Sequence, residues 1–166
     1  MDDMTGMYNR NKLLEVVNSD TYKDMQVAII YWDINRLKYV NDTFGHLSGD
    51  FLIVKIAESI RQVCGEQAET FRYGGDEFII LMRNVTTKEA VRTKAEQLMA
   101  ETKKMVFDEM DGKGITISVG IALAPEHGKT YMNLYRSADQ ALYETKRNGR
   151  NGFTIYGENR DITENR

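Results

Sequence analysis

Residues 27–32 form an unbroken run of apolar and aromatic side chains, and Asp33 ends the run. A run of this length without alternation is typical of a strand whose two faces are both buried. It therefore predicts a central strand in a sheet that has helices packed on its faces. A carboxylate at the end of such a strand points toward the place where ligands often bind, although Asp33 could equally cap the helix that follows.

Helical and strand-like patterns surround this run. Strand-like pieces flank Gly74 and Gly75, close enough for a hairpin in which glycine supplies the positive φ of a tight turn. Apolar residues recur at helical spacing elsewhere, and Asn9 is a suitable N-cap for the first such segment. The predicted helices are residues 12–17, 36–44 and 49–63, a segment opened by a capping box at 86–89, and a last long helix around 134–142. The predicted strands are residues 71–73, 77–82, 115–123 and 153–156.

This order of elements indicates an α+β domain, with a mixed, mostly antiparallel sheet of about five strands covered by helices. The length of 166 residues suits one domain, and a hydrophobic content of 42% supplies its core without disulfides. We place the domain at residues 1–157. The polar residues 158–166 predict a frayed C-terminal tail.

The net charge and the lone cysteine limit the partners and the compartment. A formal net charge of −3 argues against binding to nucleic acid through a basic field, but leaves room for a local phosphate site. Cys64 is the only cysteine, so no intrachain disulfide can form and a reducing cytoplasm fits. No apolar run reaches the ~20 residues of a membrane span, and the N-terminus lacks the pattern of a signal peptide. We therefore expect a cytoplasmic location and no membrane segment in this chain.

Two adjacent carboxylates, Asp76 and Glu77, follow Gly74 and Gly75 in the predicted hairpin turn. Neighbouring carboxylates repel one another unless water or a cation surrounds them. The turn could simply be polar and solvated, since Gly and Asp are common in turns. Alternatively, the glycines leave room for a phosphate chain. Asp33 and Asp76 would then suit Mg²⁺, which binds one or two carboxylates together with substrate phosphates.

Two further clusters could recognise a nucleotide. Asp50 could accept two hydrogen bonds from the N1–H and 2-amino edge of guanine, and Asn41 could donate and accept at a neighbouring edge. Helix capping near the adjacent glycines would explain the same residues. Lys146 and Arg150 come at the end of the last predicted helix, where cations favour the helix dipole and could also clamp a phosphate.

Together these clusters resemble the GGDEF family, the diguanylate cyclase domain. Three blocks resemble the family's DxLTGLxNR, DxDxFKxxND and GHxxGD patterns, and the GGDEF string itself follows Arg72. The blocks occur in the family's order and span almost the whole chain, which makes a chance match very improbable. They are residues 2–10, 33–42, 45–50, 72–78, 118–121 and 138–151.

The resemblance implies a fold like that of the adenylyl cyclase and polymerase palm catalytic domains. It also implies a reaction in which two GTP molecules condense to cyclic di-GMP and release two pyrophosphates. Each domain would hold one GTP, and a second copy of the domain would face it. Each ribose 3′-oxygen would then attack the α-phosphorus of the other nucleotide. Mg²⁺ or Mn²⁺ would neutralise the triphosphate and stabilise the in-line displacement.

The resemblance also assigns roles by position. Asp33, the carbonyl of Ile34 and Asp76 would be the metal ligands. Glu77 would assist either at the metal or at the attacking hydroxyl. Asn41 and Asp50 would read the guanine base. The residues that would contact the rest of the substrate are Lys38, Lys146 and Arg150 at the phosphates and Gly74 and Gly75 beside the nucleotide.

The chain departs from the family pattern in places that bear on activity and regulation. Asn35 replaces an acid and Leu37 a phenylalanine, so the alternative is a weak or inactive domain that binds GTP or a protein partner. Gly65 and Ala68 stand where many members carry an inhibitory RxxD product site, which we therefore predict to be absent. Because the first motif begins at Asp2, we expect either a sensory domain outside this chain or a domain that dimerises weakly by itself.

Overall fold

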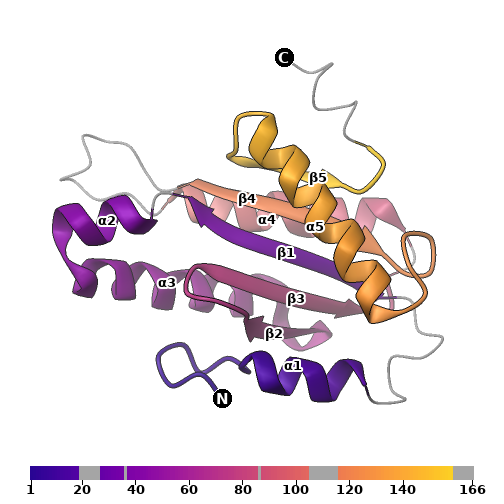
Figure 1. Cartoon of the computed structure of the whole chain (residues 1–166), viewed down its shortest axis with the longest axis horizontal. Coiled ribbons are helices and arrows are strands. Elements are labelled where there is room, and N and C mark those ends of the chain that lie inside the picture. Colours follow the sequence, from indigo (N-terminus) through magenta and orange to yellow (C-terminus); the bar gives the residue numbers. More distant parts are fainter. Residues whose placement is uncertain (19–26, 36, 86, 105–115, 159–166) are drawn as a thin grey trace.

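A mixed five-stranded sheet forms the centre of the molecule (Figure 1). The computed structural model describes residues 1–18, 27–35, 37–85, 87–104 and 116–158. The apolar run lies in β1 (Val27–Asn35), which is central in the sheet order β2-β3-β1-β4-β5. This strand is antiparallel to both neighbours, whereas β5 pairs in parallel with β4. The α+β prediction is thus confirmed. The other strands are β2 (Ala68–Arg72), β3 (Glu77–Arg83), β4 (Thr116–Leu123) and β5 (Gly152–Ile155).

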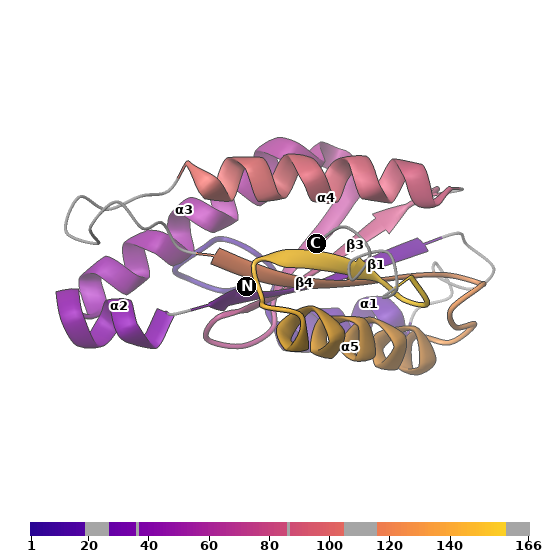
Figure 2. The same cartoon turned by 90° about the horizontal axis from the view of Figure 1, so that it is seen from above.

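Helices cover both faces of this sheet, as Figure 2 shows. Two long helices, α3 and α4, pack on one face, and α1 and α5 pack on the other. The short helix α2 follows the end of β1 and packs against α3. The helices are α1 (Arg10–Val17), α2 (Leu37–Phe44), α3 (His46–Cys64), α4 (Lys88–Lys103) and α5 (Tyr131–Arg147).

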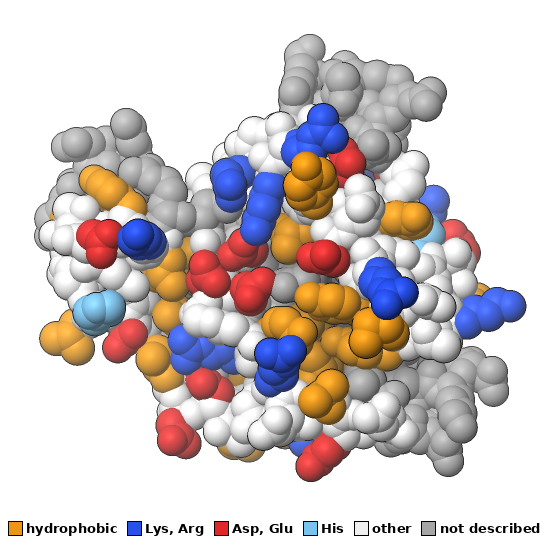
Figure 3. Space-filling view, in the orientation of Figure 1, with side chains coloured by type: hydrophobic (Ala, Val, Ile, Leu, Met, Phe, Trp, Pro, Cys, Tyr) orange, Lys and Arg blue, Asp and Glu red, His pale blue; other side chains and the backbone are white. Residues whose placement is uncertain are grey.

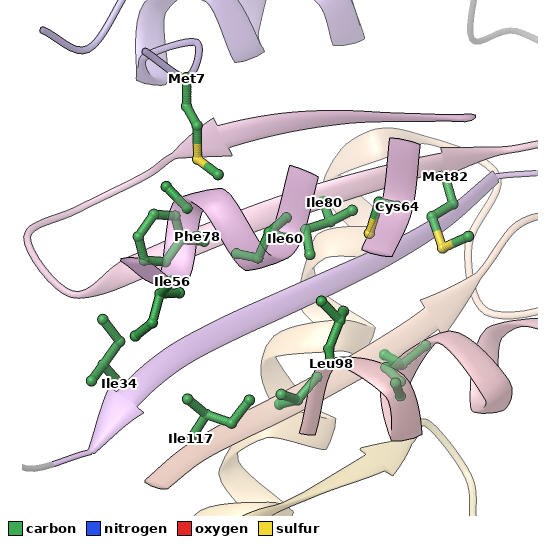
Figure 4. Packing of buried hydrophobic residues seen from close by; sticks show 14 of the residues in the cluster. Met7, Ile34, Ile56, Ile60, Cys64, Phe78, Ile80, Met82, Leu98 and Ile117 are labelled. Carbon is green, nitrogen blue, oxygen red and sulfur yellow. The ribbon is translucent and has the colours of Figure 1, made fainter. Parts of the chain in front are cut away.

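The alternation of side chains along β3 divides the core between the two faces. Phe78 and Ile80 belong to the cluster under α3 and α4, part of which Figure 4 shows. Ile79 and Leu81 belong to the cluster under α1 and α5. All four side chains are buried, and Cys64 is buried in the first cluster. Because β3 is held on both faces, the turn that precedes it is firmly positioned.

Helix α5 lies close against β4 because residue 120 has no side chain. A Cβ atom on Gly120 would lie 2.2 Å from the carbonyl oxygen of Ala138 and 2.3 Å from the amide nitrogen of Leu142. One turn further along, the buried Thr145 hydroxyl donates a hydrogen bond of 2.8 Å to the carbonyl oxygen of Val119. These contacts fix the last turn of α5 over the sheet, one residue before Lys146.

Several element boundaries differ from the predictions by a few residues: α1 begins at Arg10, β2 begins at Ala68, and two other helices show a local cause. Helix α3 begins at His46 rather than at residue 49, because Leu47, the apolar residue of its first turn, is exposed and does not extend the buried apolar face. The N-cap of α4 is Thr87, whose hydroxyl accepts from the Ala90 amide, so the predicted capping box is wrong by one position. The capping residue that it named, Thr86, and residues 159–166 of the predicted tail lie outside the described residues.

Across the described parts of the chain, none of the helices combines the length and the hydropathy that a membrane crossing requires.

Candidate active site

The end of β1 lies directly beside the turn between β2 and β3. Asp33 on β1 is the register partner of Glu77 on β3, and the Ile34 amide donates a 3.0 Å hydrogen bond to the carbonyl oxygen of Asp76. The structure therefore brings together Asp33, Ile34, Asp76 and Glu77, although more than 40 residues of chain separate the two pairs. A purely structural domain would not need acidic residues from two strands at one point.

Burial and mutual repulsion shape the electrostatics of these carboxylates. Asp33 is 9% exposed. Burial, followed by the charge of Asp33, raises the pKa of Asp76, and the charge of Glu77 adds to the rise. Such a group of close carboxylates is stable only with a cationic partner or with partial protonation. The arrangement therefore favours binding of a cation.

The donor set fits a hard divalent cation that keeps other ligands of its own. One carboxylate oxygen of Asp33, Oδ1, is buried and has no hydrogen-bond partner among the described residues. Among the residues that the structure describes, no group of three or more His, Cys, Asp and Glu side chains is arranged to hold a metal. The oxygen donors that the structure brings to this point are the carboxylates of Asp33 and Asp76. Two carboxylates completed by substrate phosphates and water are a common arrangement for Mg²⁺.

The turn that carries Asp76 is a hairpin, as predicted, but its glycines act differently from the prediction. The amides of Tyr73 and Gly74 donate to the carbonyl oxygen of Glu77, at 2.8 and 3.3 Å, and close the turn. Neither Gly74 nor Gly75 has a positive φ, so that expectation is wrong. Gly74 instead lies close to the Glu77 side chain, because a Cβ there would be 2.7 Å from Oε1 of Glu77. The glycine therefore lets the Glu77 carboxylate fold back over the turn.

The basic residues predicted to bind phosphates differ in their position and in their contacts with the acidic group. Lys146, in the last turn of α5, forms an ion pair with Oδ2 of Asp33. Arg150 follows the end of that helix in a left-handed conformation, with its amide bonded to the carbonyl oxygen of Thr145 at 3.0 Å. Lys38 is exposed near the start of α2, five residues after Asp33. Figure 3 shows basic side chains beside a group of acidic ones over this end of the sheet.

Asn41 and Asp50 lie on two packed helices beside this end of β1. The side-chain oxygen of Asn41 is buried without a hydrogen-bond partner among the described residues, and it lies against Gly49. Asp50 is the next residue on α3 and is half-buried. The N-cap of that helix is Gly45, and no side chain caps the helix. The capping explanation is therefore not borne out for this pair, and Asn41 keeps an unused acceptor.

A connection that sequence patterns did not reveal joins the N-terminal turn to the acidic turn. Arg72, at the end of β2, forms an ion pair of 3.2 Å with Asp2 and donates a 3.1 Å hydrogen bond to the carbonyl oxygen of Gly75. Asp2 also accepts from the amide and hydroxyl of Thr5. Burial opposes ionisation of Asp2, but the Thr5 hydrogen bonds and the Arg72 charge outweigh it and lower its pKa. No local signal could find this contact, since 70 residues separate the two partners.

The family comparison agrees with this geometry. The family model "Diguanylate cyclase, GGDEF domain" matches residues 1–152. The chain belongs to this family. Diguanylate cyclase A of Treponema denticola is 36% identical over 151 residues, a match that covers 88% of this chain and 39% of that protein. This GGDEF domain thus spans about two fifths of the length of that relative.

Solved GGDEF domains share the fold. The GGDEF domain of YfiN (TpbB) from Pseudomonas aeruginosa superposes with a TM-score of 0.81 at 29% identity, over 99% of both chains. The GGDEF domain of DgcB from Caulobacter crescentus, solved in complex with c-di-GMP, also gives a TM-score of 0.81, at 28% identity over 94% of this chain and 95% of that one. The expected architecture of the GGDEF family is therefore confirmed for this chain.

Proposed function

We propose that this GGDEF domain is an active diguanylate cyclase that condenses two GTP molecules into cyclic di-GMP and two pyrophosphates. The observation that carries the proposal is the meeting of Asp33 and Asp76 at one end of the sheet, with the Ile34 amide bonded to the Asp76 carbonyl oxygen. This places two hard oxygen donors beside a glycine turn, where a triphosphate could approach the backbone.

In this proposal Asp33, Asp76 and the Ile34 carbonyl hold Mg²⁺ or Mn²⁺. The metal would supply charge neutralisation for the triphosphate and stabilise the in-line displacement. Glu77 adds a carboxylate that serves either the metal or the attacking 3′-hydroxyl. The buried, unpaired acceptor of Asn41 and the carboxylate of Asp50 receive the donors of the guanine edge.

The basic residues hold the phosphates. Lys38 lies near the start of α2, and Lys146 and Arg150 lie at or just after the end of α5. Of these, Lys146 pairs with Asp33 of the acidic group. Charge-assisted hydrogen bonds from such groups to phosphate are stronger than neutral ones. Gly74 and Gly75 carry no side chain that would block the nucleotide.

The reaction requires a second copy of the domain. Each half-site holds one GTP, whose 3′-hydroxyl gives up its proton to water or to a nearby base as its oxygen bonds to the α-phosphorus of the GTP in the facing copy. The bond between that phosphorus and the bridging oxygen of its pyrophosphate then breaks. Two such transfers, one in each direction, close the ring. We propose a transient homodimer, brought together by self-association or by a sensory domain outside this chain.

The test is to incubate the protein with GTP and Mg²⁺ and to separate the nucleotides by chromatography. Cyclic di-GMP should appear with the wild type and be lost with Asp76→Asn, which keeps the size of the side chain. Absence of product at any protein concentration would reject the proposal.

The alternative is a domain that binds GTP, or a protein partner, without turnover. The departure at Leu37 favours it, because this side chain is buried at the start of α2, close to the site. Calorimetry separates the two functions, since the alternative predicts GTP binding without product even at concentrations that force dimers.

A further inference from the structure

Lys146 is the cation that the protein itself supplies to its acidic site. Its ammonium forms an ion pair with Oδ2 of Asp33, and the two side chains are only 30% and 13% exposed. The charge of Lys146 also opposes the rise that burial and Asp33 cause in the pKa of Asp76. An ion pair this sheltered is screened little by salt. It therefore balances part of the negative charge when no ligand is bound.

The backbone that carries Lys146 is fixed, whereas its side chain can change partner. The neighbouring Thr145 is buried and its hydroxyl contacts both the Val119 carbonyl oxygen, at 2.8 Å, and the Thr154 hydroxyl, at 2.7 Å. The long lysine side chain is the movable part of this last helical turn. Rotation about its own bonds is enough to carry the ammonium from a carboxylate to a phosphate nearby.

A divalent cation and this ammonium compete for the same carboxylate. The free oxygen of Asp33, Oδ1, is an available ligand, but Oδ2 is occupied by Lys146. A metal bound at Oδ1 of Asp33 would lie close to the Lys146 ammonium, which contacts the other oxygen of the same carboxylate. Two positive charges on one carboxylate repel each other strongly. A polyphosphate alone would meet Asp33, Asp76 and Glu77. The metal alone therefore lacks an anion that draws the ammonium away from Asp33. The polyphosphate alone lacks a cation that neutralises the carboxylates.

We propose that Lys146 is an exchangeable counter-ion that couples metal binding to polyphosphate binding: the polyphosphate draws its ammonium from Asp33, and the cation takes its place. This inference rests on the metal and phosphate roles in the proposed function. It adds that the binding of one ligand strengthens the binding of the other. The two ligands then bind with positive cooperativity, which is reciprocal by necessity. Lys146 acts as a positioning residue for the metal as well as a phosphate contact.

The experiment measures binding of Mn²⁺ without any turnover. The wild type and Lys146→Met are titrated with Mn²⁺ and bound metal is followed by electron paramagnetic resonance, at about 0.15 M ionic strength, where the Debye length is about 8 Å. Each titration is repeated with inorganic triphosphate at matched free Mn²⁺. Lys146→Gln is a second variant of similar length, to be used if Lys146→Met does not fold.

The account predicts that triphosphate tightens Mn²⁺ binding to the wild type by about 5- to 150-fold, the usual range of coupling between sites. Lys146→Met should bind Mn²⁺ alone several-fold more tightly than the wild type, and the tightening by triphosphate should be smaller by about the same factor. The matched control is Arg147→Met, which removes an equal charge from the next residue, whose guanidinium lies over the Tyr143 ring. This control should behave as the wild type.

Two results would overturn the inference: Mn²⁺ binding to Lys146→Met that is no tighter than to the wild type, or coupling in Lys146→Met that is as strong as in the wild type. A tightening that Arg147→Met reproduces would also overturn it, because the effect would then come from net charge. These outcomes are independent of cyclase activity. A protein that makes no cyclic di-GMP but shows the predicted coupling would reject the proposed function and retain the counter-ion role.

Discussion

The side-chain oxygen of Asn41 occupies the space that a Cβ atom of residue 49 would need: an ideal Cβ on Gly49 would lie 1.7 Å from it. The glycine on α3 therefore determines where the amide of Asn41 on α2 can lie. This amide oxygen is also buried and without a partner among the described residues. The pair explains why a glycine stands inside the first turns of a helix, where it costs stability.

Gly49→Ala should therefore weaken GTP binding by displacing Asn41. We expect the Kd for GTP to rise by about tenfold or more, equivalent to about 1.4 kcal/mol. Alanine in a helix is more stable than glycine by about 0.5–1 kcal/mol, which offsets the cost of displacing the Asn41 side chain. The free energy of unfolding should therefore change little. Calorimetry with GTP measures the first quantity. Gly152→Ala is the control, because its Cβ would meet only the Arg150 carbonyl oxygen, at 3.8 Å. Unchanged GTP affinity in Gly49→Ala would contradict the role of Asn41.

Asp2→Asn should destabilise the fold, because Asp2 accepts from Thr5 and pairs with Arg72. Hydrogen bonds to a charged group contribute about 1.5–3 kcal/mol each at most, and we expect a loss of about 1–2 kcal/mol in the free energy of unfolding. Urea denaturation at pH 7 measures it. Asp3→Asn, at an exposed neighbouring position, is the control and should resemble the wild type.

The same variant carries a pH prediction. The pKa of Asp2 is lowered in the folded protein, so the ionised carboxylate stabilises the fold at pH values above the unfolded pKa of about 3.9. That contribution disappears as the pH falls through the folded pKa. The difference in stability between wild type and Asp2→Asn should therefore be constant near pH 7 and shrink toward pH 3. A difference that does not change with pH would show that the charge of Asp2 is not what stabilises the turn.

Thr145 and Thr154 should behave as a coupled pair. Their hydroxyls are 2.7 Å apart and both residues are buried between α5 and β5. Thr145→Val leaves the Thr154 hydroxyl without this partner, at a cost of about 1–3 kcal/mol, whereas in Thr154→Val the Thr145 hydroxyl keeps its bond to the Val119 carbonyl oxygen. The double replacement removes both hydroxyls, so the unpaired hydroxyl of the first variant is absent. The double variant should thus be less destabilised than the two single ones combined, by about 0.5 kcal/mol or more. Thr93→Val, on the exposed side of α4, is the control. Strict additivity in denaturation would contradict the pairing.

Much of the fold could be predicted because its signals are local. The apolar run of β1, the hairpin around Gly74 and Gly75 and the helical spacing of α3 each describe one element by its own residues. The residues of the acidic site were predicted from motif resemblance, and the structure brings the two acidic blocks together. Such local signals predict an element but not its contacts with distant elements.

Contacts between distant elements were not predictable in this way. The ion pair of Asp2 with Arg72 and that of Lys146 with Asp33 join residues that only the assembled sheet brings together. The expected positive φ of the turn glycines failed for a related reason. The structure shows instead that the Glu77 side chain approaches Gly74 closely, and a dipeptide pattern does not contain that information.

If two copies of this domain form one active site, the rate of cyclic di-GMP formation depends on protein concentration. Cyclic di-GMP formation from GTP and Mg²⁺ is measured from nanomolar to micromolar protein, with the oligomeric state followed by analytical ultracentrifugation. The account predicts that the rate per protomer rises with concentration until the dimer dominates. A constant rate per protomer while the protein is monomeric, or no cyclic di-GMP at any concentration, would contradict it.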